Sequence, residues 1–583
     1  MKNKRITALF LVVALCLSTF GCSMIEEGQK ADEATDFSAH STVDNHIRDK
    51  KLLYEQYDPL EVVTMYLTVS TGNSADGTDH TWEEINTYSA YDYEAMGVDR
   101  YKVDGLLQVG DETGALPGEL GYGQQSPNCT SQIRGQTSSR SPQKNYKISV
   151  KDNKGEWRGQ TTIALNKHQT EGMRFRNKLA YDLMTGIDQM MGLRTTFVHL
   201  YVKDTTEGGD GQFHDYGIYT QVEQLNKTAL KAHGLDRNGH LYKINHFEFY
   251  RYEDIIKLKD DPGYDTVKFE ELLEIKGSDD HEKLITMLDK INDYSIPIED
   301  ILAEHFDTEN IAYWLAFNIL TGNVDTQSRN VYIYSALNSD RWYFLPWDND
   351  AALRKEEHKI LGRYDYQEWE TGVSNYWGNV FFQRCLRSES FRKELTAAIE
   401  DLKKYLSHEK IDSLAYAYAE VVKPYLYRDP DITYAPLTSD EYDTVLSELK
   451  NEIDLNYDLY YESFKKPMPF FIGVPEKKDG KISLLWDAAY DFDDEKITYS
   501  FELARDSAFT DMILKEEGLL IPSIEFDELG QGQYFVRVKA TNESGYTQTA
   551  FDYYMGTFGK TYGTKCFYVD SEGKIVEDVY VET

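Results

Sequence analysis

The chain has 583 residues, of which 41% are hydrophobic and 13% aromatic, and its formal net charge is −37. That length allows two to four domains with large buried cores, and the aromatic content argues against wholesale disorder. The negative charge disfavours DNA, RNA and anionic lipid, so we expect no nucleic-acid partner. A site for a phosphate-bearing ligand must therefore gather Lys and Arg side chains, because the negative charge of the whole chain repels phosphate.

The N-terminus has the composition of an export signal. Three basic residues precede an apolar run at 6–20, and Ser-Thr-Phe-Gly-Cys at 18–22 resembles a bacterial lipobox, in which Cys22 would carry lipid after cleavage. The run is too short for a membrane span. We therefore predict an exported protein on the extracytoplasmic face of the cell membrane, with its lipid as the only membrane contact; a plain secretory signal is the alternative. Residues 23–59 are polar and acidic, as in a linker.

Strand signals dominate the first half of the predicted domain at 60–465. Strands are expected at 60–70, 145–150, 197–202 and 216–222, and one helix at 173–184. Helices dominate from residue 299, with an apolar core helix at 310–320 and more helices over 378–464. This order predicts an α+β fold with two lobes and a hinge near 221–226.

A composition shift at 465–469 marks the start of a smaller domain. Alternating strands are predicted at 481–486, 497–504 and 533–540, and Trp486 with the later Tyr-x-Val-x-Val pattern resembles a fibronectin type III sandwich over 466–560. Residues 561–583 are left as a C-terminal tail without an assigned structure.

The cysteines predict neither a disulfide framework nor a metal site. Cys16 lies in the signal and Cys22 in the lipobox, while Cys129, Cys385 and Cys566 are far apart in the chain. The fold must be held by its core alone.

The stretch 322–350 carries the strongest chemical signal. Asp325 lies five residues before Asn330, and Asp348 and Asp350 follow a predicted hairpin. Phosphoryl transfer needs a carboxylate to receive the proton of the attacking hydroxyl, and amide and carboxylate oxygens to hold Mg²⁺ on the phosphates. Protein kinases use the same Asp-x-x-x-x-Asn spacing, although the flanking His-Arg and Phe-Gly are absent here. On spacing alone, turn-capping residues or a structural Ca²⁺ loop explain the pattern better.

Five blocks together resemble the spore coat protein H (CotH) family. In chain order they are IRGQTSS at 133–139, KNYK at 144–147, RNKLA at 176–180, YGIYTQVEQ at 216–224 and LPWDND at 345–350. The resemblance extends over about 60–465. It implies an atypical two-lobed protein-kinase-like fold, followed here by the small all-β sandwich, and an enzyme that uses ATP and a divalent metal, Mg²⁺ or Mn²⁺, to phosphorylate Ser.

The resemblance also implies a role for each acidic or amide residue of the motif. Asp325 would be the catalytic residue that takes the hydroxyl proton. Asn330 and Asp348 would coordinate the metal, with Asp350 as a further ligand.

Phosphate-binding residues and a hinge complete the ATP site that the resemblance implies. Arg134, Gly135 and Lys144 would hold the phosphates, because Gly allows close backbone approach and the cations neutralise phosphate charge. Lys147 competes with Lys144, and strand parity places it on the opposite face. Glu223 is assigned to the hinge, where backbone groups at 221–224 would hold adenine; a structural role is the alternative.

Two further expectations concern the loop before the helix at 173–184 and the charge of the protein substrates. Lys167 and His168 precede the helix at 173–184, and we expect His168 to be exposed. The acidic surface would steer basic, Ser-rich protein substrates to the enzyme.

An alternative function from another class is a non-catalytic surface lipoprotein with an adhesion or carbohydrate-binding role. ATP is scarce outside the cell, which favours this alternative. The joint presence of Asp325, Asn330, Asp348 and Lys144 argues against it. No Gly-x-Ser-x-Gly elbow, His-Glu-x-x-His helix or Walker lysine motif points to another enzyme.

Overall fold

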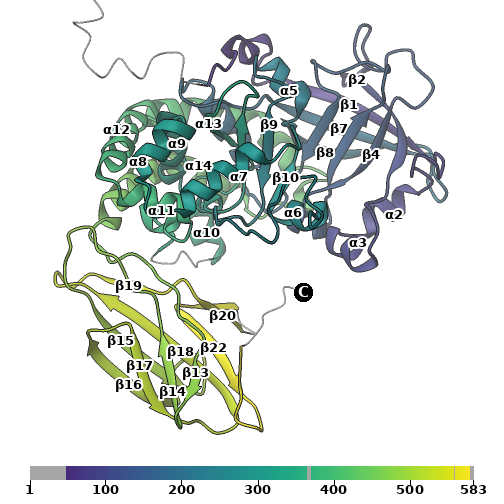
Figure 1. Ribbon diagram of the computed structural model, residues 1–583. Helices are drawn as coiled ribbons and strands as arrows, with labels where there is room; N and C mark the ends of the chain where they lie inside the picture. Colours follow the sequence, from purple (N-terminus) through teal and green to yellow (C-terminus); the bar gives the residue numbers. More distant parts are fainter. Residues whose placement is uncertain (1–46, 364–368, 557–558, 578–583) are drawn as a thin grey trace, which may run out of the picture. The chain divides into compact units, whose positions relative to one another are not determined.

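The computed structural model (Figure 1) describes residues 47–363, 369–556 and 559–577. The predicted signal and lipobox, with Cys22, lie outside these described residues. Within them, no helix is long and apolar enough to cross a membrane. Cys129, Cys385 and Cys566 are buried free thiols.

Eight strands of the amino-terminal part form one sheet. They are β1 Val62–Ser70, β2 Val103–Asp111, β3 Gly114–Ala115, β4 Cys129–Arg134, β5 Asn145–Val150, β6 Thr162–Asn166, β7 Thr195–Asp204 and β8 Phe213–Glu223. Their order is β1-β7-β8-β6-β5-β4-β2-β3, and β1 also pairs with β2, which closes the sheet into a barrel (Figure 1). β1 is parallel to β7, whereas the other neighbours are antiparallel.

The inside of the barrel is an apolar core. Successive side chains of a strand point to opposite faces, so alternate residues line the interior. Tyr146, Ile148 and Val150 of β5 point inward, as the alternating pattern predicted, and they pack with Ile133 of β4 and Ile163 of β6. The residues between them face the outside of the barrel, which we call the outer face.

Short helices precede β1 and connect the later strands of the barrel. They are η2 Lys51–Gln56, α2 Trp82–Thr87, α3 Ala90–Met96, η3 Thr137–Arg140 and α4 Arg176–Met184. Helices α2 and α3 each start with a capping box, formed by Thr81 with Glu84 and by Ser89 with Asp92. α4 confirms the predicted helix, and eight of its nine residues are buried. It is therefore a core helix that can hold other elements in place.

Beyond β8 the chain is mostly helical. The helices are α5 Lys227–Ala232, α6 Thr266–Leu272, α7 Glu282–Asn292, α8 Ile298–His305, α9 Thr308–Thr321, η4 Val324–Thr326, α10 Lys355–Leu361, η5 Gly372–Tyr376, α11 Val380–Arg387, α12 Glu389–Tyr405, α13 His408–Leu426, η6 Ile432–Tyr434 and α14 Ser439–Ser463. The chain leaves the barrel after Glu223 and enters α5 at Lys227. The connection at 224–226 therefore falls within the predicted hinge.

A second, antiparallel sheet lies within the helical region. Its strands are β9 His240–Ile244, β10 Leu273–Ile275, β11 Val331–Ser335 and β12 Tyr343–Pro346, in the order β10-β9-β11-β12. The β11–β12 hairpin was predicted, but the sheet was not. β11 pairs with β9, which comes far earlier in the chain, and a local pattern does not reveal such a partner.

Helix α9 is the apolar centre of the helical region. Eleven of its fourteen residues are buried, and Trp314 stacks on Phe382 of α11 with ring centroids 5.8 Å apart. The side chain of Asp307 caps its first turn, and Gly322 ends it at φ +63. The end of α9 thereby places the residues from 323 onward against the second sheet.

The C-terminal region is all β. Its strands are β13 Glu476–Lys478, β14 Lys481–Leu485, β15 Thr498–Ala504, β16 Met512–Leu519, β17 Ser523–Asp527, β18 Gly532–Thr541, β19 Thr547–Thr549, β20 Tyr553–Gly556, β21 Gly559–Tyr562, β22 Thr564–Val569 and β23 Ile575–Glu577. A β13-β14-β17 sheet and a β16-β15-β18-β22-β23 sheet contribute to one apolar core that contains Trp486. β22 lies in the predicted tail but pairs with β18. The fibronectin type III assignment stays a prediction.

A buried ion pair fastens the α13–α14 connection to the barrel. Lys167 Nζ lies 2.6 Å from Asp431 Oδ1, and both side chains are 1% exposed. The backbone N–H of Ile218 donates to Asp431 Oδ2 at 2.9 Å. Gly217 has φ +73, and a Cβ there would fall 2.1 Å from the same oxygen. Only glycine fits this contact without moving Asp431.

We expect Gly217→Ala to lower the free energy of unfolding by about 3 kcal/mol or more, because it adds left-handed strain and displaces a buried carboxylate from its cation. Gly77→Ala is the control, since Gly77 has φ +64 and nothing within 4 Å of an added Cβ. The control should lose only about 1–2 kcal/mol from strain. Urea unfolding measures both, and equal losses would contradict the role of the contact.

Candidate functional site

The loop after α9 carries the first two predicted site residues, and we call residues 323–330 the Asp–Asn loop. Its backbone is held by side chains from η5 and from the turn before α11. Asn375 Nδ2 donates to the carbonyl oxygen of Val324 at 3.0 Å, and Asn379 Nδ2 donates to that of Gln327 at 2.8 Å. The hydroxyl oxygens of Thr326 and Tyr376 are 2.8 Å apart. The loop is therefore positioned by contacts far away in the sequence.

Asp325 and Asn330 contact each other directly, as their spacing suggested. Asn330 Nδ2 donates to Asp325 Oδ2 at 3.0 Å, and Arg329 Nε donates to Asp325 Oδ1 at 2.6 Å. Burial raises the pKa of Asp325, although the charge of Arg329 opposes this shift. The carboxylate is about one-third exposed, so a hydroxyl group can approach it.

The other predicted acids follow β12, and we call residues 348–350 the acidic turn. Two residues of α4 hold its backbone. The N–H of Asp348 donates to the hydroxyl of Tyr181 at 2.9 Å, and the N–H of Asn349 donates to Asn177 Oδ1 at 3.1 Å. Asp348 has φ +51, an uncommon conformation for a non-glycine residue that these contacts stabilise. The role of α4 at this turn was not predicted.

Electrostatics links the acidic turn to the Asp–Asn loop. Burial and the neighbouring charge of Asp350 raise the pKa of Asp348 to about 7, and Asp325 adds to this effect. The charges of His168 and Arg134 act in the opposite direction. Burial also disfavours the charged form of Asp350, but a hydrogen bond with His168 and the charges of His168, Arg354 and Arg176 together outweigh it and lower the pKa. The structure thus brings four predicted site residues together with one that was not predicted.

His168 is that additional residue, and the expectation that it is exposed is wrong. Its side chain is 4% exposed and its Nδ1 lies 3.5 Å from Asp350 Oδ2. The backbone of His168 has φ +49, a left-handed turn that directs the chain from β6 towards α4. A single histidine in a polar loop gives no sequence signal of this burial, because the elements that cover it come from elsewhere in the chain.

Arg134 and Gly135 lie where β4 ends. Gly135 has φ +87, and a Cβ there would fall 2.1 Å from Ser138 Oγ, so the turn requires glycine. The guanidinium of Arg134 donates to Asn166 Oδ1 and lies 5.8 Å from the ring centroid of Trp347. Burial lowers the pKa of Arg134 and the carboxylate of Asp348 opposes that shift. Arg134 is therefore next to the acidic turn.

The two candidate lysines have different surroundings. Lys144 is buried and its Nζ donates to the carbonyl oxygen of Ser139 at 2.6 Å, within the β4–β5 connection. Lys147 is half-buried and shares the outer face with Arg134, because β4 and β5 pair in register. Burial and nearby cations lower the pKa of Lys147; these cations are Lys276, Lys102, Arg134 and Arg100. Lys147 therefore lies on the face that carries Arg134, whereas the ammonium of Lys144 is held by the β4–β5 connection, and the phosphate-binding role of Lys144 stays a prediction.

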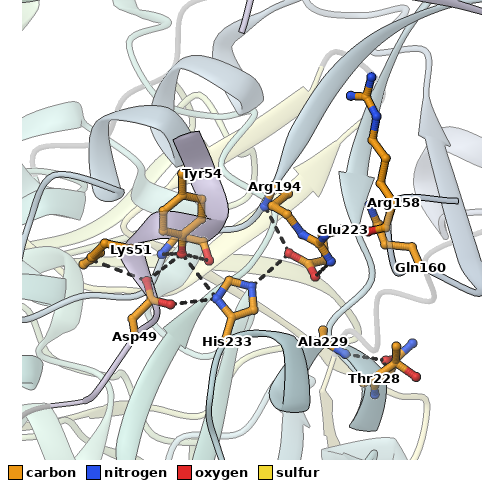
Figure 2. Close-up of polar contacts among 12 residues, drawn as sticks. Asp49, Lys51, Tyr54, Arg158, Gln160, Arg194, Glu223, Thr228, Ala229 and His233 are labelled. Carbon is orange, nitrogen blue, oxygen red and sulfur yellow. Dashed lines mark hydrogen bonds and ion pairs between the residues drawn. The ribbon is translucent and has the colours of Figure 1, made fainter. Parts of the chain in front are cut away.

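Glu223 belongs to a buried ion network (Figure 2) and not to the outer face. Strand parity places it in the row of Ile163, on the inside of the barrel. Its carboxylate lies 2.5 Å from Arg194 Nη2 and 2.9 Å from His233 Nε2. Asp49 Oδ1 contacts the other ring nitrogen of His233 at 2.7 Å. This arrangement matches the structural role that the sequence left open for Glu223, and it gives no contact to a cofactor on the outer face.

The residues of the acidic turn suit a divalent cation. Among the described residues, no three His, Cys, Asp or Glu side chains gather as a metal site. The predicted set, however, combines the amide of Asn330 with the carboxylates of Asp348 and Asp350, and Mg²⁺ takes oxygen donors of this kind together with water and phosphate. The mutual repulsion of Asp348 and Asp350 is what a bound cation would relieve.

These features define a class of protein. A barrel and a helical region joined by a short hinge, with an Asp–Asn loop, a hairpin and an acidic turn, form a mixed α+β protein-kinase-like fold, and all-β sheets follow it. The family model for CotH kinase protein matches residues 132–460. The chain belongs to this CotH kinase family.

The chain is also similar, at low identity, to one curated protein and two solved structures. The inner spore coat protein H of Bacillus subtilis (strain 168) is 24% identical over 294 residues, which are 49% of this chain and 74% of that protein. A chain from the HipA, HipB and operator DNA complex of Shewanella oneidensis MR-1 matches with 11% identity and a TM-score of 0.23, over 52% of this chain and 58% of its own length. The Helicobacter pylori proinflammatory kinase CtkA matches with 14% identity and a TM-score of 0.21, over 54% of this chain and 94% of its own length.

The ion network predicts a pH-dependent stability. Burial disfavours a charged imidazole, but the carboxylates of Glu223 and Asp49 outweigh it and raise the pKa of His233 to about 9. Tyr54 also faces this ring. Because the pKa is about 6.5 in an unfolded chain, this stabilisation is complete below pH 6.5 and is lost as the pH rises to 9, a change of about 3 kcal/mol. His233→Gln should remove this dependence.

Urea unfolding between pH 6 and 9.5 provides the measurement. The matched control is His214→Gln, because His214 is an exposed histidine that pairs with Asp210. It should keep the wild-type pH dependence. A wild-type profile with the same slope as that of His233→Gln would refute the prediction.

Proposed function

We propose that this chain is an exported protein kinase that uses ATP and a divalent metal to phosphorylate serine in protein substrates. Its membership of the CotH kinase family implies ATP use. The observation that carries the proposal is the contact between the Asp–Asn loop and the acidic turn, where Asn323 Nδ2 donates to Asn349 Oδ1 at 3.2 Å, with Arg134 next to that turn. This arrangement supplies a base, metal-binding oxygens and a phosphate-binding cation in one place.

Asp325 is the proposed catalytic residue. The serine Oγ attacks the γ-phosphorus while the bond from that phosphorus to the β,γ-bridging oxygen breaks, and ADP leaves with the bond electrons. Asp325 accepts the hydroxyl proton, and its raised pKa favours that transfer. Asn330 holds one oxygen of this carboxylate at 3.0 Å, which fixes its direction. Arg329 holds the other oxygen and limits its rotation.

The phosphates would lie against the outer face near Arg134 and Lys147. Gly135 lets the β4–β5 connection turn close to them. Asn330, Asp348 and Asp350 would hold Mg²⁺ or Mn²⁺, which neutralises phosphate charge when bound. Backbone groups at 221–224 would hold the adenine base, as the position of the hinge suggests.

The proposed setting of the enzyme follows from its termini and its charge. Lipid on Cys22 would anchor the protein to the extracytoplasmic face of the cell membrane, and the C-terminal sandwich would serve as a fibronectin-like spacer or docking surface. The acidic chain would attract basic, Ser-containing protein substrates. Phosphorylation of such substrates should slow as ionic strength rises, because salt screens this attraction.

Phosphate transfer from labelled ATP to a basic Ser-rich peptide tests the proposal with the chain from residue 23. Asp325→Asn and Asp348→Asn should each lower kcat by about 10²- to 10⁴-fold, because one removes the base and the other a metal ligand. Asp340→Asn is the control, since Asp340 is an exposed acid between β11 and β12. Its activity should equal that of the wild type. If the wild type neither transfers phosphate nor binds ATP, the non-catalytic lipoprotein is the better account.

A second experiment decides between the two lysines. Lys147→Ala should weaken ATP binding by about tenfold, because it removes a cation from the outer face. Lys144→Ala should leave ATP affinity unchanged and lower the melting temperature, because the Lys144 ammonium bonds the carbonyl of Ser139. Calorimetric titration with a non-hydrolysable ATP analogue measures the affinity of both variants. The opposite result would support Lys144 as the phosphate-binding lysine.

A further inference from the structure

The connection from the barrel to the helical region is short, so its two flanks determine its position. β8 ends at Glu223 and α5 begins at Lys227. Asn226 caps α5, and its Oδ1 accepts hydrogen bonds from the N–H groups of Thr228 and Ala229 at 2.8 and 3.0 Å. A connection of this length has little freedom once both flanks are held.

The two flanks are tied to each other by charge (Figure 2). His233 is the C-terminal cap of α5, and its Nε2 lies 2.9 Å from Glu223 Oε2, with both side chains at most 1% exposed. Arg194 adds an ion pair to Glu223, and its backbone N–H donates to the same carboxylate at 3.1 Å. The end of β8 and the end of α5 therefore cannot move apart without separating buried charges.

Asp49 completes this network from the other side of the ring. Its Oδ1 lies 2.7 Å from His233 Nδ1, and neither side chain is exposed. The hydroxyl of Tyr54 donates to Asp49 Oδ2 at 2.6 Å, and the backbone N–H of Lys50 donates to the carbonyl oxygen of His233 at 3.0 Å. Two carboxylates thereby balance the guanidinium of Arg194 and a charged imidazole.

The segment that provides Asp49 is anchored in its own right and comes from outside the matched family region. Lys51 Nζ donates to the carbonyl oxygens of Ile187 and Met190 at 2.9 and 2.7 Å. The family model begins only at residue 132. Residues 48–56 therefore contact the hinge network from outside the region that the family model matches.

We infer that Asp49 and His233 are positioning residues for the nucleotide: residues 48–56 brace the hinge, and ATP affinity depends on this brace. The inference rests on the proposed kinase function, because the hinge at 221–224 is where the adenine base would bind. Without Asp49 the ring of His233 keeps one carboxylate partner, and the connection after Glu223 gains freedom. The adenine base then has to order this connection when ATP binds. That cost weakens ATP binding but does not alter the chemical step.

The test compares Asp49→Asn and Tyr54→Phe with the control Glu55→Gln, in the chain from residue 23. Glu55 is exposed on the same short helix, η2. We expect the Kd of a non-hydrolysable ATP analogue to rise about tenfold in Asp49→Asn and about threefold in Tyr54→Phe. The kcat at saturating ATP should stay within about twofold, and amide hydrogen exchange at 224–233 should become faster. A merely structural defect would lower kcat through loss of folded enzyme and leave KM unchanged.

The outcomes separate this inference from the proposed function. If Asp49→Asn does not fold, the milder Tyr54→Phe, which keeps the aromatic ring, carries the test. A wild type that binds the analogue, with both variants equal to Glu55→Gln in Kd and exchange, overturns the brace alone. A wild type that binds no nucleotide overturns the proposed function and this inference with it.

Discussion

The geometry of the site depends on one buried arginine, Arg176 of α4. Its Nε donates to the carbonyl oxygen of Leu353 at 2.8 Å, and its Nη1 contacts the carboxylates of Glu171 and Glu357. The three charged side chains are at most 1% exposed, so the loss of one partner would leave an uncompensated charge in a medium of low polarisability. α4 is thereby fixed to the chain that follows the acidic turn, and its contacts with the backbone of that turn are preserved.

The barrel shows that the matched family region is not self-contained in this chain. The family model starts at residue 132, whereas β1, β2 and β3 precede it. β1 closes the barrel by pairing with both β7 and β2, and its inward side chains, such as Met65 and Leu67, belong to the same core as Ile133. The region where we propose that the nucleotide binds therefore needs the earlier strands, because they complete its core and close the hydrogen bonding between the barrel strands.

Positive charge is concentrated on one face of the barrel, although the whole chain is strongly acidic. The outer face gathers cations around Lys147, and the acidic turn lies beside Arg134. A polyphosphate with its metal needs both signs close together, cations for the phosphate oxygens and carboxylates for the metal. The buried networks of Glu223 and of Arg176 lie outside this face and hold the elements that carry it.

Local patterns were enough for the parts of the protein that depend on near neighbours. The alternation in β5, the apolar run of α9 and the five-residue spacing of Asp325 and Asn330 are visible in the sequence, because strand parity, helix burial and a short loop are local properties. Tertiary structure alone decided the rest. The burial of His168, the position of Lys147 on the same face as Arg134 and the inward position of Glu223 depend on strand pairing and on partners such as Asp350 and Asp49. These partners are far apart in the sequence, and no periodic pattern of residues relates them. Only the folded chain brings them together.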